Sequence, residues 1–409
     1  MIPVQKAIEI ALAETSPIGT ETVSIFDVNG FVLAQDVYSD IDIPPWDKSA
    51  MDGYAFKHSD VTDAPVELRV VGFIPAGVYP EVRVGKGEAA KIMTGAPVPE
   101  GADTIQMVEK TQSINKEKVK ILEGVILGNH VAKKAEVLRS GEKVLTKGML
   151  ISPAVIGVLA TVGKREVEIF RRPTVGILVT GDELVEVPQT PRAGQIRNSN
   201  GYVLFNQVRE CRATPEWLGI APDNLDQLSE KIAHGLTKDI LLISGGVSMG
   251  DLDLVEDVFA NLGVKVLYDK VDIKPGKPSV FGTGKDTLVF GLPGNPVSAS
   301  TVFEVIAKPV LRKMMGFEQV HSPKLTAILS EDFRSKTKRA NYAPAWVHYQ
   351  QNSLIATPIA SKGSADVLAF AKSNAYMVIP GHQMKIKKGQ EVDVLLRDEF
   401  WRTCQQSMI

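Results

Sequence analysis

The sequence has only two cysteines, Cys211 and Cys404, among 409 residues. Two cysteines cannot build a disulfide framework or a cysteine-rich zinc site, so a reducing compartment is expected. No apolar run is long enough to cross a bilayer. Residues 1–14 carry charges within a helical apolar pattern, whereas a secretion signal has an uncharged central region. We therefore predict a cytoplasmic protein that does not associate with a membrane.

The chain also lacks a strong excess of charge of either sign, because its net charge is −2. This excludes a general attraction to nucleic acid or to an acidic membrane, so any anion site must be built locally. The six histidines lie in unrelated contexts, and none has metal-ligand spacing. The stretch GLPGNP lacks the serine of a nucleophile elbow. We expect chemistry by positioning and electrostatics, without a covalent nucleophile.

The length predicts two to four domains. From residue 173, continuous apolar strands alternate with helices, which is typical of a doubly wound α/β domain with a mostly parallel sheet. Residues 20–40 predict two strands joined by a turn at Asn29-Gly30, residues 153–163 a helix, and residues 296–316 a long closing helix. We expect four units, namely a helical/β linking domain at 1–43 and 139–172, an inserted β-rich domain at 44–138, the α/β domain at 173–322, and a C-terminal β barrel at 323–409.

Three strands of the predicted α/β domain end in glycine-rich turns, TGDEL, SGGVSMGDLD and LPGNP. Ligands of such sheets bind at the carboxyl ends of the strands, where backbone N–H groups and helix N-termini can hold a phosphate. The alternative is that the glycines only make tight turns. The candidate binding residues are Thr180, Gly181, Ser244, Gly245, Gly246, Ser248, Gly250, Pro293, Asn295 and Pro296.

Carboxylates crowd the same turns, at Asp182, Glu183, Asp251 and Asp253. Asp251 is the expected cap of the following helix. The others would repel a phosphate unless a cation lies between them, and Mg²⁺ is the natural choice. Nearby, alternation places Lys270 and Lys274 on one face of a strand, followed by Lys277. These lysines either protect a sheet edge or form an oxyanion cradle, and chemistry alone does not separate the two.

The loop PPWDKSAMDGYAF places Asp52 in a nearly uncharged setting. Asp-Gly readily adopts the positive φ angles of a hairpin turn. Asp52 is therefore either a turn former or a carboxylate presented for chemistry.

Six segments, PPWDKSAMDGYA, KIMTGAPVPEGADTIQMVE, VTGDEL, SGGVSMGDLD, KPGKP and GLPGNPVSA, resemble the signature segments of molybdopterin molybdenumtransferases, a family that includes the E domain of gephyrin. The resemblance covers essentially the whole chain. It implies an elongated homodimer with active sites at the subunit interface. It also implies a Mg²⁺-dependent reaction that cleaves adenylylated molybdopterin, inserts molybdate and releases AMP, with a molybdopterin adenylyltransferase as a possible partner.

The resemblance also implies residue roles. Asp52 matches the essential loop aspartate that reaches into the partner's crevice, and its Asp-Gly turn would present the carboxylate. Asp52, Glu183 and Asp253 would be the metal ligands, with Asp223 as a further acid of the site. The residues implied to bind substrate, besides the turn residues above, are Ser49, Thr94, Lys270, Lys274, Lys277 and Ser364.

Two stretches depart from the family pattern. Where the family carries Arg-x-x-Gly-Glu-Asp, this chain has Ala132, Ala135 and Val137 at the arginine, glycine and aspartate positions. In the barrel, the family carries the pattern Gly-Arg-x-x-aromatic-x-Arg. Arg339 and Tyr342 fit its first arginine and its aromatic residue, whereas Pro344 stands at its second arginine.

Three hypotheses follow from this comparison. The first is a working transferase with an adjusted site, for molybdate or tungstate. The second is a paralogue that binds molybdopterin nucleotide or oxyanion without turnover, as a carrier, regulator or scaffold. The third is a different nucleotide hydrolase, which the segment SAMDGYA disfavours.

Overall fold

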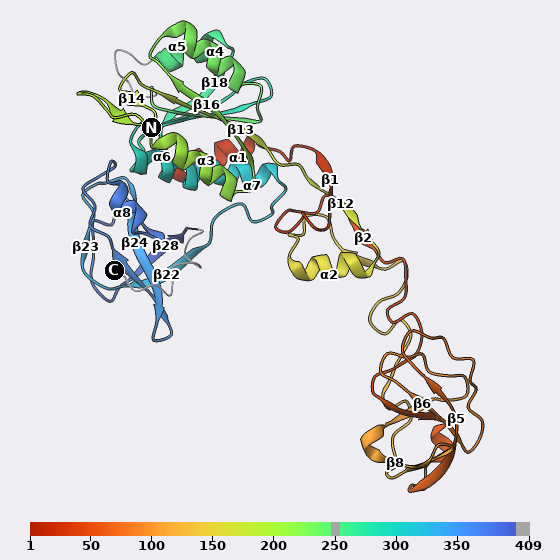
Figure 1. Ribbon diagram of the computed structural model, residues 1–409. Helices are drawn as coiled ribbons and strands as arrows, with labels where there is room; N and C mark the ends of the chain where they lie inside the picture. The colour runs from red at the N-terminus through yellow and green to blue at the C-terminus, as the bar shows by residue number, and fades with distance from the viewer. Residues whose placement is uncertain (247–253, 398–409) are drawn as a thin grey trace.

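The structure is a computed structural model that describes residues 1–246 and 254–397. The molecule is elongated, with a β-rich unit at one end and two bodies at the other (Figure 1). A narrow segment with one helix connects them. None of the helices in the described ranges has the length and apolar character needed to span a membrane. The unit boundaries given above remain a prediction.

The distal β unit contains one six-stranded sheet in the order β7-β4-β6-β5-β9-β8. Its two faces are covered by separate apolar clusters, one containing Phe56 and one containing Ile92. The strands are β4 (Gly53–Phe56), β5 (Val66–Ile74), β6 (Glu88–Ile92), β7 (Thr104–Met107), β8 (Thr111–Asn115) and β9 (Lys118–Ile121), with short helices η1 (His58–Asp60) and η2 (Val108–Lys110). A separate pair, β3 (Lys48–Ser49) and β10 (Val131–Ala132), lies beside the sheet.

The connecting segment corrects one prediction. The strand β1 (Thr20–Ser24) pairs with β12 (Glu166–Phe170), not with the segment that follows Asn29-Gly30. That segment instead reaches β2 (Val37–Tyr38), which pairs with β11 (Lys143–Leu145). The turn itself is present, because Gly30 has a φ of 81°. The predicted helix is confirmed as α2 (Pro153–Thr161), capped by the Ser152 side chain.

The central body contains a six-stranded sheet in the order β16-β13-β17-β21-β20-β18. The first four strands are parallel to one another, whereas β20 pairs antiparallel with β21 and β18 pairs antiparallel with β20. The sheet is therefore mixed, with four neighbouring parallel strands. Its strands are β13 (Thr174–Thr180), β16 (Thr214–Ala221), β17 (Ile240–Ser244), β18 (Lys265–Lys270), β20 (Pro278–Thr283) and β21 (Leu288–Leu292). A short parallel pair, β14 (Leu184–Val185) and β15 (Ile196–Arg197), lies outside it.

Helices cover both faces of this sheet, as a doubly wound fold requires. One face packs against α1 (Val4–Ala13), α3 (Asn200–Glu210) and the closing helix, and the other against α4 (Leu225–Gly235) and α5 (Leu254–Asn261). The closing helix is continuous but contains a π turn, since α6 (Pro296–Val302) passes through η3 (Phe303–Ala307) into α7 (Lys308–Met314).

The C-terminal body is a closed five-stranded barrel, because the additional β24–β26 pairing joins the ends of the order β24-β25-β22-β28-β26. The strand β19 (Ile273–Lys274) of the central body extends this sheet by pairing with β24. The elements are β22 (Lys324–Leu329), β23 (Phe333–Arg334), β24 (Ala340–Gln350), β25 (Ser353–Pro358), α8 (Val367–Ala371), β26 (Ala375–Ile379), β27 (Lys385–Ile386) and β28 (Glu391–Leu396).

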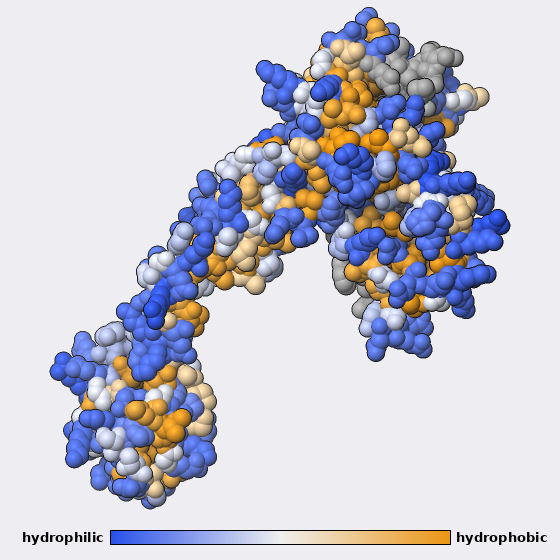
Figure 2. Space-filling model, turned by 180° about the vertical axis from the view of Figure 1, so that it is seen from behind, coloured by the Kyte–Doolittle hydropathy of each residue, from blue (hydrophilic) through white to orange (hydrophobic). Residues whose placement is uncertain are grey.

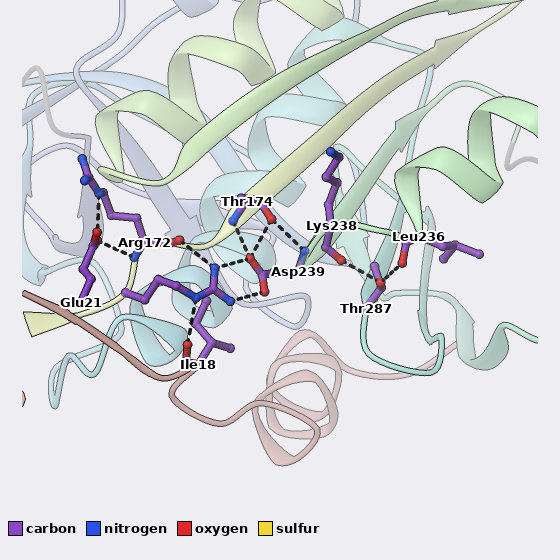
Figure 3. Close-up of polar contacts among 9 residues, drawn as sticks. Ile18, Glu21, Arg172, Thr174, Leu236, Lys238, Asp239 and Thr287 are labelled. Atoms are coloured by element: carbon purple, nitrogen blue, oxygen red, sulfur yellow. Dashed lines mark hydrogen bonds and ion pairs between the residues drawn. The ribbon is translucent and has the colours of Figure 1, made fainter.

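Polar contacts fix the connecting segment to the central sheet at the starts of β13 and β17 (Figure 3). The guanidinium of Arg171 donates to both carboxylate oxygens of Asp239, at 2.9 and 2.7 Å, and to the carbonyl of Ile18 at 3.1 Å. Thr174 donates to Asp239 through its backbone N–H and its hydroxyl, at 2.7 and 2.8 Å. Burial tends to raise the pKa of Asp239, but the bonds from Arg171 and Thr174 outweigh it and hold that pKa below the ordinary value.

Candidate functional site

A cavity of about 440 Å³ opens at the carboxyl ends of the parallel strands. It lies where the strand order reverses, because β16 is on one side of β13 and β17 on the other. All three glycine-rich turns line it, so the structure brings together the residues that the sequence placed at strand ends. Those among them that line the cavity are Thr180, Gly181, Glu183, Asp223, Ser244, Gly245, Gly246, Pro293, Asn295 and Pro296.

The glycines of the second turn are required by close packing against β13. A Cβ on Gly245 would lie 2.4 Å from the carbonyl oxygen of Thr180, and one on Gly246 would lie 2.8 Å from its hydroxyl oxygen. Both residues also have positive φ, at 98° and 61°. The glycines are therefore needed for the tight turn, and the same turn forms the cavity wall. That it binds a ligand stays a prediction.

Asn200 connects the turns of the cavity and was not singled out from the sequence. Its side-chain amide donates to the Ser244 hydroxyl and to the carbonyl of Gly294, both at 2.8 Å. Ser244 in turn donates to the carbonyl of Pro293 at 3.2 Å. Ser244 therefore holds the cavity wall together. The signal for Asn200 was the stretch RNSN, which opens a helix after the TGDEL turn.

Two carboxylates line the cavity, those of Glu183 and Asp223. Asp182 does not line it, and its carboxylate accepts a hydrogen bond from the backbone N–H of Asp223 at 3.0 Å. Within residues 1–246 and 254–397, no group of three or more acidic, histidine or cysteine side chains could hold a metal. Two carboxylates still fit Mg²⁺, which binds through one or two carboxylates and completes its shell with water and phosphate oxygens.

Four predicted residues, Ser248, Gly250, Asp251 and Asp253, lie outside the described residues. The predicted capping role of Asp251 and the predicted metal role of Asp253 therefore stay predictions.

A second cavity of about 700 Å³ adjoins the first, and Pro278, Pro293 and Asn295 line both. It lies between the closing helix and the barrel. Its predicted residues are Lys274, Lys277 and Ser364, and it also contains the basic residues Arg334, Lys336 and Arg339 and the acidic residues Glu331 and Asp332. Lys270 lines neither cavity; its ammonium lies 3.4 Å from the carboxylate of Asp269. Two of the three lysines of the predicted cradle, Lys274 and Lys277, therefore line this cavity, and their role in binding an oxyanion stays a prediction.

Asp52 lies in the distal unit, directly before β4. One of its carboxylate oxygens accepts hydrogen bonds from the backbone N–H of Thr94 at 2.6 Å and from the Thr94 hydroxyl at 2.7 Å. These two bonds lower the pKa of Asp52 below its ordinary value. Ser49 is buried, and its hydroxyl donates to the carbonyl of Met51, so it shapes the loop from inside.

The turn expected at Asp52-Gly53 is wrong, because neither residue has positive φ. Gly53 is instead the first residue of β4, where a Cβ would lie 1.9 Å from the carbonyl oxygen of Gln106. Glycine is needed here for close approach to β7, and that contact sets the position of Asp52.

The stretch 132–137, which differs from the family's Arg-x-x-Gly-Glu-Asp pattern, runs antiparallel to the segment that leads into the Asp52 loop. Ala132 lies opposite Lys48, and Leu138 lies opposite Ile43. Ala135 has a φ of 59°, which fits a position where the resembled pattern has glycine. Val137 is 76% exposed. The second departure, Pro344, lines the second cavity.

Within one chain, the Asp52 loop and the first cavity belong to opposite ends of the molecule (Figure 1). Asp52 and Glu183, two members of the expected metal set, are therefore not brought together by a single chain.

Comparison with known proteins agrees with this architecture. Residues 2–163 match the MoeA N-terminal region (domain I and II), residues 176–313 a probable molybdopterin binding domain, and residues 326–396 the MoeA C-terminal region (domain IV). A molybdopterin molybdenumtransferase of Bacillus subtilis is 35% identical over 403 residues, which is 97% of this chain and 94% of that protein. One from a Nostoc species is 38% identical over 386 residues, 92% of this chain and 88% of that protein.

The molybdopterin biosynthesis moeA protein of Pyrococcus horikoshii has a crystal structure that superposes with a TM-score of 0.83 at 31% identity, covering 97% of this chain and 100% of that one. Similarity of this extent shows that the chain belongs to the molybdopterin molybdenumtransferase family.

Proposed function

We propose that this protein inserts molybdate into adenylylated molybdopterin with release of AMP, giving molybdenum cofactor, as a cytoplasmic enzyme. The observation that carries the proposal is the pair of adjoining cavities, one with two carboxylates at the strand switch point and one with lysines and arginines. A nucleotide-linked pterin and an oxyanion need neighbouring sites of this kind.

The first cavity would hold the pterin nucleotide against the backbone of its three turns. Glu183 and Asp223 would hold Mg²⁺, which supplies charge neutralisation at the phosphates and polarises the anhydride when bound. In the second cavity, Lys274, Lys277 and Arg339 would orient the oxyanion, and Ser364 would donate a hydrogen bond to it. Tungstate has the same shape and charge and is the alternative oxyanion.

Asp52 would act in the cavity of a second copy of the chain. The support is that Asp52 directly precedes β4 of the unit at the far end of the elongated molecule, and that Thr94 stabilises the charge of its carboxylate. We therefore propose a homodimer with two shared sites. A molybdopterin adenylyltransferase is the proposed supplier of substrate.

A second candidate function is binding of molybdopterin nucleotide or oxyanion without turnover. Val137 and Pro344 favour it, because both place apolar side chains where the resembled patterns have charged ones.

The test is AMP release from adenylylated molybdopterin by the purified protein with Mg²⁺, with and without molybdate. Molybdate-dependent AMP release with formation of active cofactor is the expected result. Tight binding of adenylylated molybdopterin without AMP release would instead support the second candidate function, binding without turnover.

The shared site has its own test. Asp52→Ala and Glu183→Gln should each abolish AMP release while leaving the dimer intact. Mixing the two variants under subunit exchange should restore about a quarter of the wild-type activity, because about half the dimers are then mixed and each has one complete site. No recovery on mixing would place Asp52 and Glu183 in the same chain's site.

A further inference from the structure

The barrel carries a cluster of basic side chains at the mouth of the second cavity. Segments 331–340 and 384–391 contain seven basic residues and three acidic ones, in a chain whose net charge is −2. Six of these basic side chains are exposed, and we call them the basic ribbon: Arg334, Lys336, Lys338, Lys385, Lys387 and Lys388. Hydrophilic residues cover much of the barrel surface in Figure 2.

The ribbon is joined to the cavity by strand pairing. Arg334 and Lys336 line the second cavity. In the pairing of β23 with β27, Arg334 stands directly opposite Lys385. The positive charge of the cavity wall therefore continues outward across β27.

The six basic side chains of the ribbon outnumber the three acids of the same segments, of which Glu331 and Asp332 line the second cavity. Lys387 pairs with Asp332 at 2.9 Å, and the same carboxylate accepts the backbone N–H of Lys388 at 2.9 Å. Within the described part of the chain, no ion pair involves Arg334, Lys336, Lys338 or Lys385. Like charges directly opposite each other on two strands are destabilising. An arrangement that costs stability and faces a cavity points to an anionic ligand rather than to edge protection alone.

We propose that the basic ribbon draws small polyanions into the second cavity, and that it serves the oxyanion and phosphate groups of the reaction proposed above, on which this inference rests. A positively charged surface around a cleft raises the local concentration of anions and their rate of entry, and salt screens the effect.

The test variant is Lys385→Glu combined with Lys388→Glu. Neither residue lines the first or the second cavity, so the contacts inside both are kept. The carboxylate introduced at position 385 would face Arg334 and replace a repulsive pair with an attractive one, so the fold should be at least as stable. The matched control is Lys265→Glu with Lys285→Glu, two exposed lysines near the start of β21, at the end of the central sheet away from the first cavity.

The probe is molybdate in equilibrium dialysis, which needs no turnover. At an ionic strength of about 0.01 M, where the Debye length is about 30 Å, the ribbon variant should bind molybdate about 3- to 10-fold more weakly than wild type and control. At about 1 M, where the Debye length is about 3 Å, the three proteins should converge. Equal affinity of ribbon variant and control at low salt overturns the proposal, as does a difference that persists at high salt.

The same proteins separate this inference from the proposed function. Molybdate binding with the expected salt dependence, but without AMP release, would support the proposed role of the ribbon and contradict the proposed transferase activity. If the wild type binds molybdate at neither salt concentration, the proposed role of the ribbon is wrong. Where AMP is released, kcat/KM at low salt should fall in the ribbon variant while kcat stays unchanged.

Discussion

Thr94 donates both its backbone N–H and its hydroxyl to one carboxylate oxygen of Asp52, at 2.6 and 2.7 Å. The two residues are 42 positions apart and belong to different loops of the distal unit. Hydrogen bonds to a carboxylate favour its charged form. The pair therefore both orients Asp52 and keeps it ionised.

Thr94→Val removes the hydroxyl bond and keeps the backbone bond. The pKa of Asp52 is held below its ordinary value by both bonds, so removing one raises it. If ionised Asp52 is required, the acidic limb of the pH profile of kcat/KM for AMP release moves to higher pH, toward the ordinary aspartate range, and activity falls by about 2- to 5-fold at pH values below about 4. Thr94→Ser keeps the hydroxyl and should retain the wild-type profile. If the acidic limb of the profile is not shifted in Thr94→Val, the ionisation of Asp52 does not limit the reaction.

Gly53→Ala tests the close approach that positions the loop. The new Cβ would lie 1.9 Å from the backbone oxygen of Gln106, so β4 and β7 must move apart. We expect a loss of about 1–3 kcal/mol in the stability of the distal sheet, measured by faster amide hydrogen exchange in β4 and β7. Gly124→Ala is the control in the same unit, since its Cβ would have open space and only one atom at 4.0 Å. Equal exchange in both variants would contradict the packing argument.

Arg171→Ala should loosen the junction between the connecting segment and the central sheet. It leaves the Asp239 carboxylate, whose side chain is 16% exposed, with Thr174 alone. Because Arg171 itself is 38% exposed and partly screened, we expect a cost of about 1–3 kcal/mol at neutral pH. Arg172→Ala, which loses an exposed pair with Glu21, should cost about 0–1 kcal/mol.

The pH dependence of unfolding distinguishes the two variants. The pKa of Asp239 is lowered in the folded protein, so its pairing stabilises the fold above the unfolded pKa of about 4 and is lost as pH falls through the lower folded value. The difference in thermal stability between wild type and Arg171→Ala should therefore shrink in acid. A constant difference across that range would mean that Arg171 acts through packing rather than through its charge.

Local patterns in the sequence predicted the central body well. The strand ends at Thr180, Ser244 and Leu292 could be located because continuous apolar runs stop at glycine-rich turns. Parallel alternation then required these ends to meet, and the first cavity lies there. Antiparallel β20 and β18 were not predicted, since an apolar strand carries no sign of its direction.

Contacts between distant residues could not be predicted in the same way. The strand β1 pairs with β12, about 150 residues away, although a nearby Asn-Gly turn favoured a local hairpin. Gly53 looked like a turn residue because the neighbouring backbone at Gln106 is invisible in sequence. The bonds from Thr94 to Asp52 and from Asn200 to Ser244 likewise depend on loops brought together by tertiary packing.

Val137→Asp restores the carboxylate of the resembled pattern on the ladder that leads into the Asp52 loop. The backbone N–H of Val137 donates to Ile43 at 2.9 Å, and the side chain is 76% exposed, so the substitution should change stability by less than about 0.5 kcal/mol. We expect a higher rate of AMP release or tighter Mg²⁺ binding, because an added carboxylate near the shared site offers the metal a further oxygen. The measurement is AMP release as a function of Mg²⁺ concentration. Val137→Asn has nearly the same shape without the charge and should leave both quantities unchanged. If aspartate performs no better than asparagine, then residue 137 does not face the metal, and the acids of the site are those already in place at Asp52, Glu183 and Asp223.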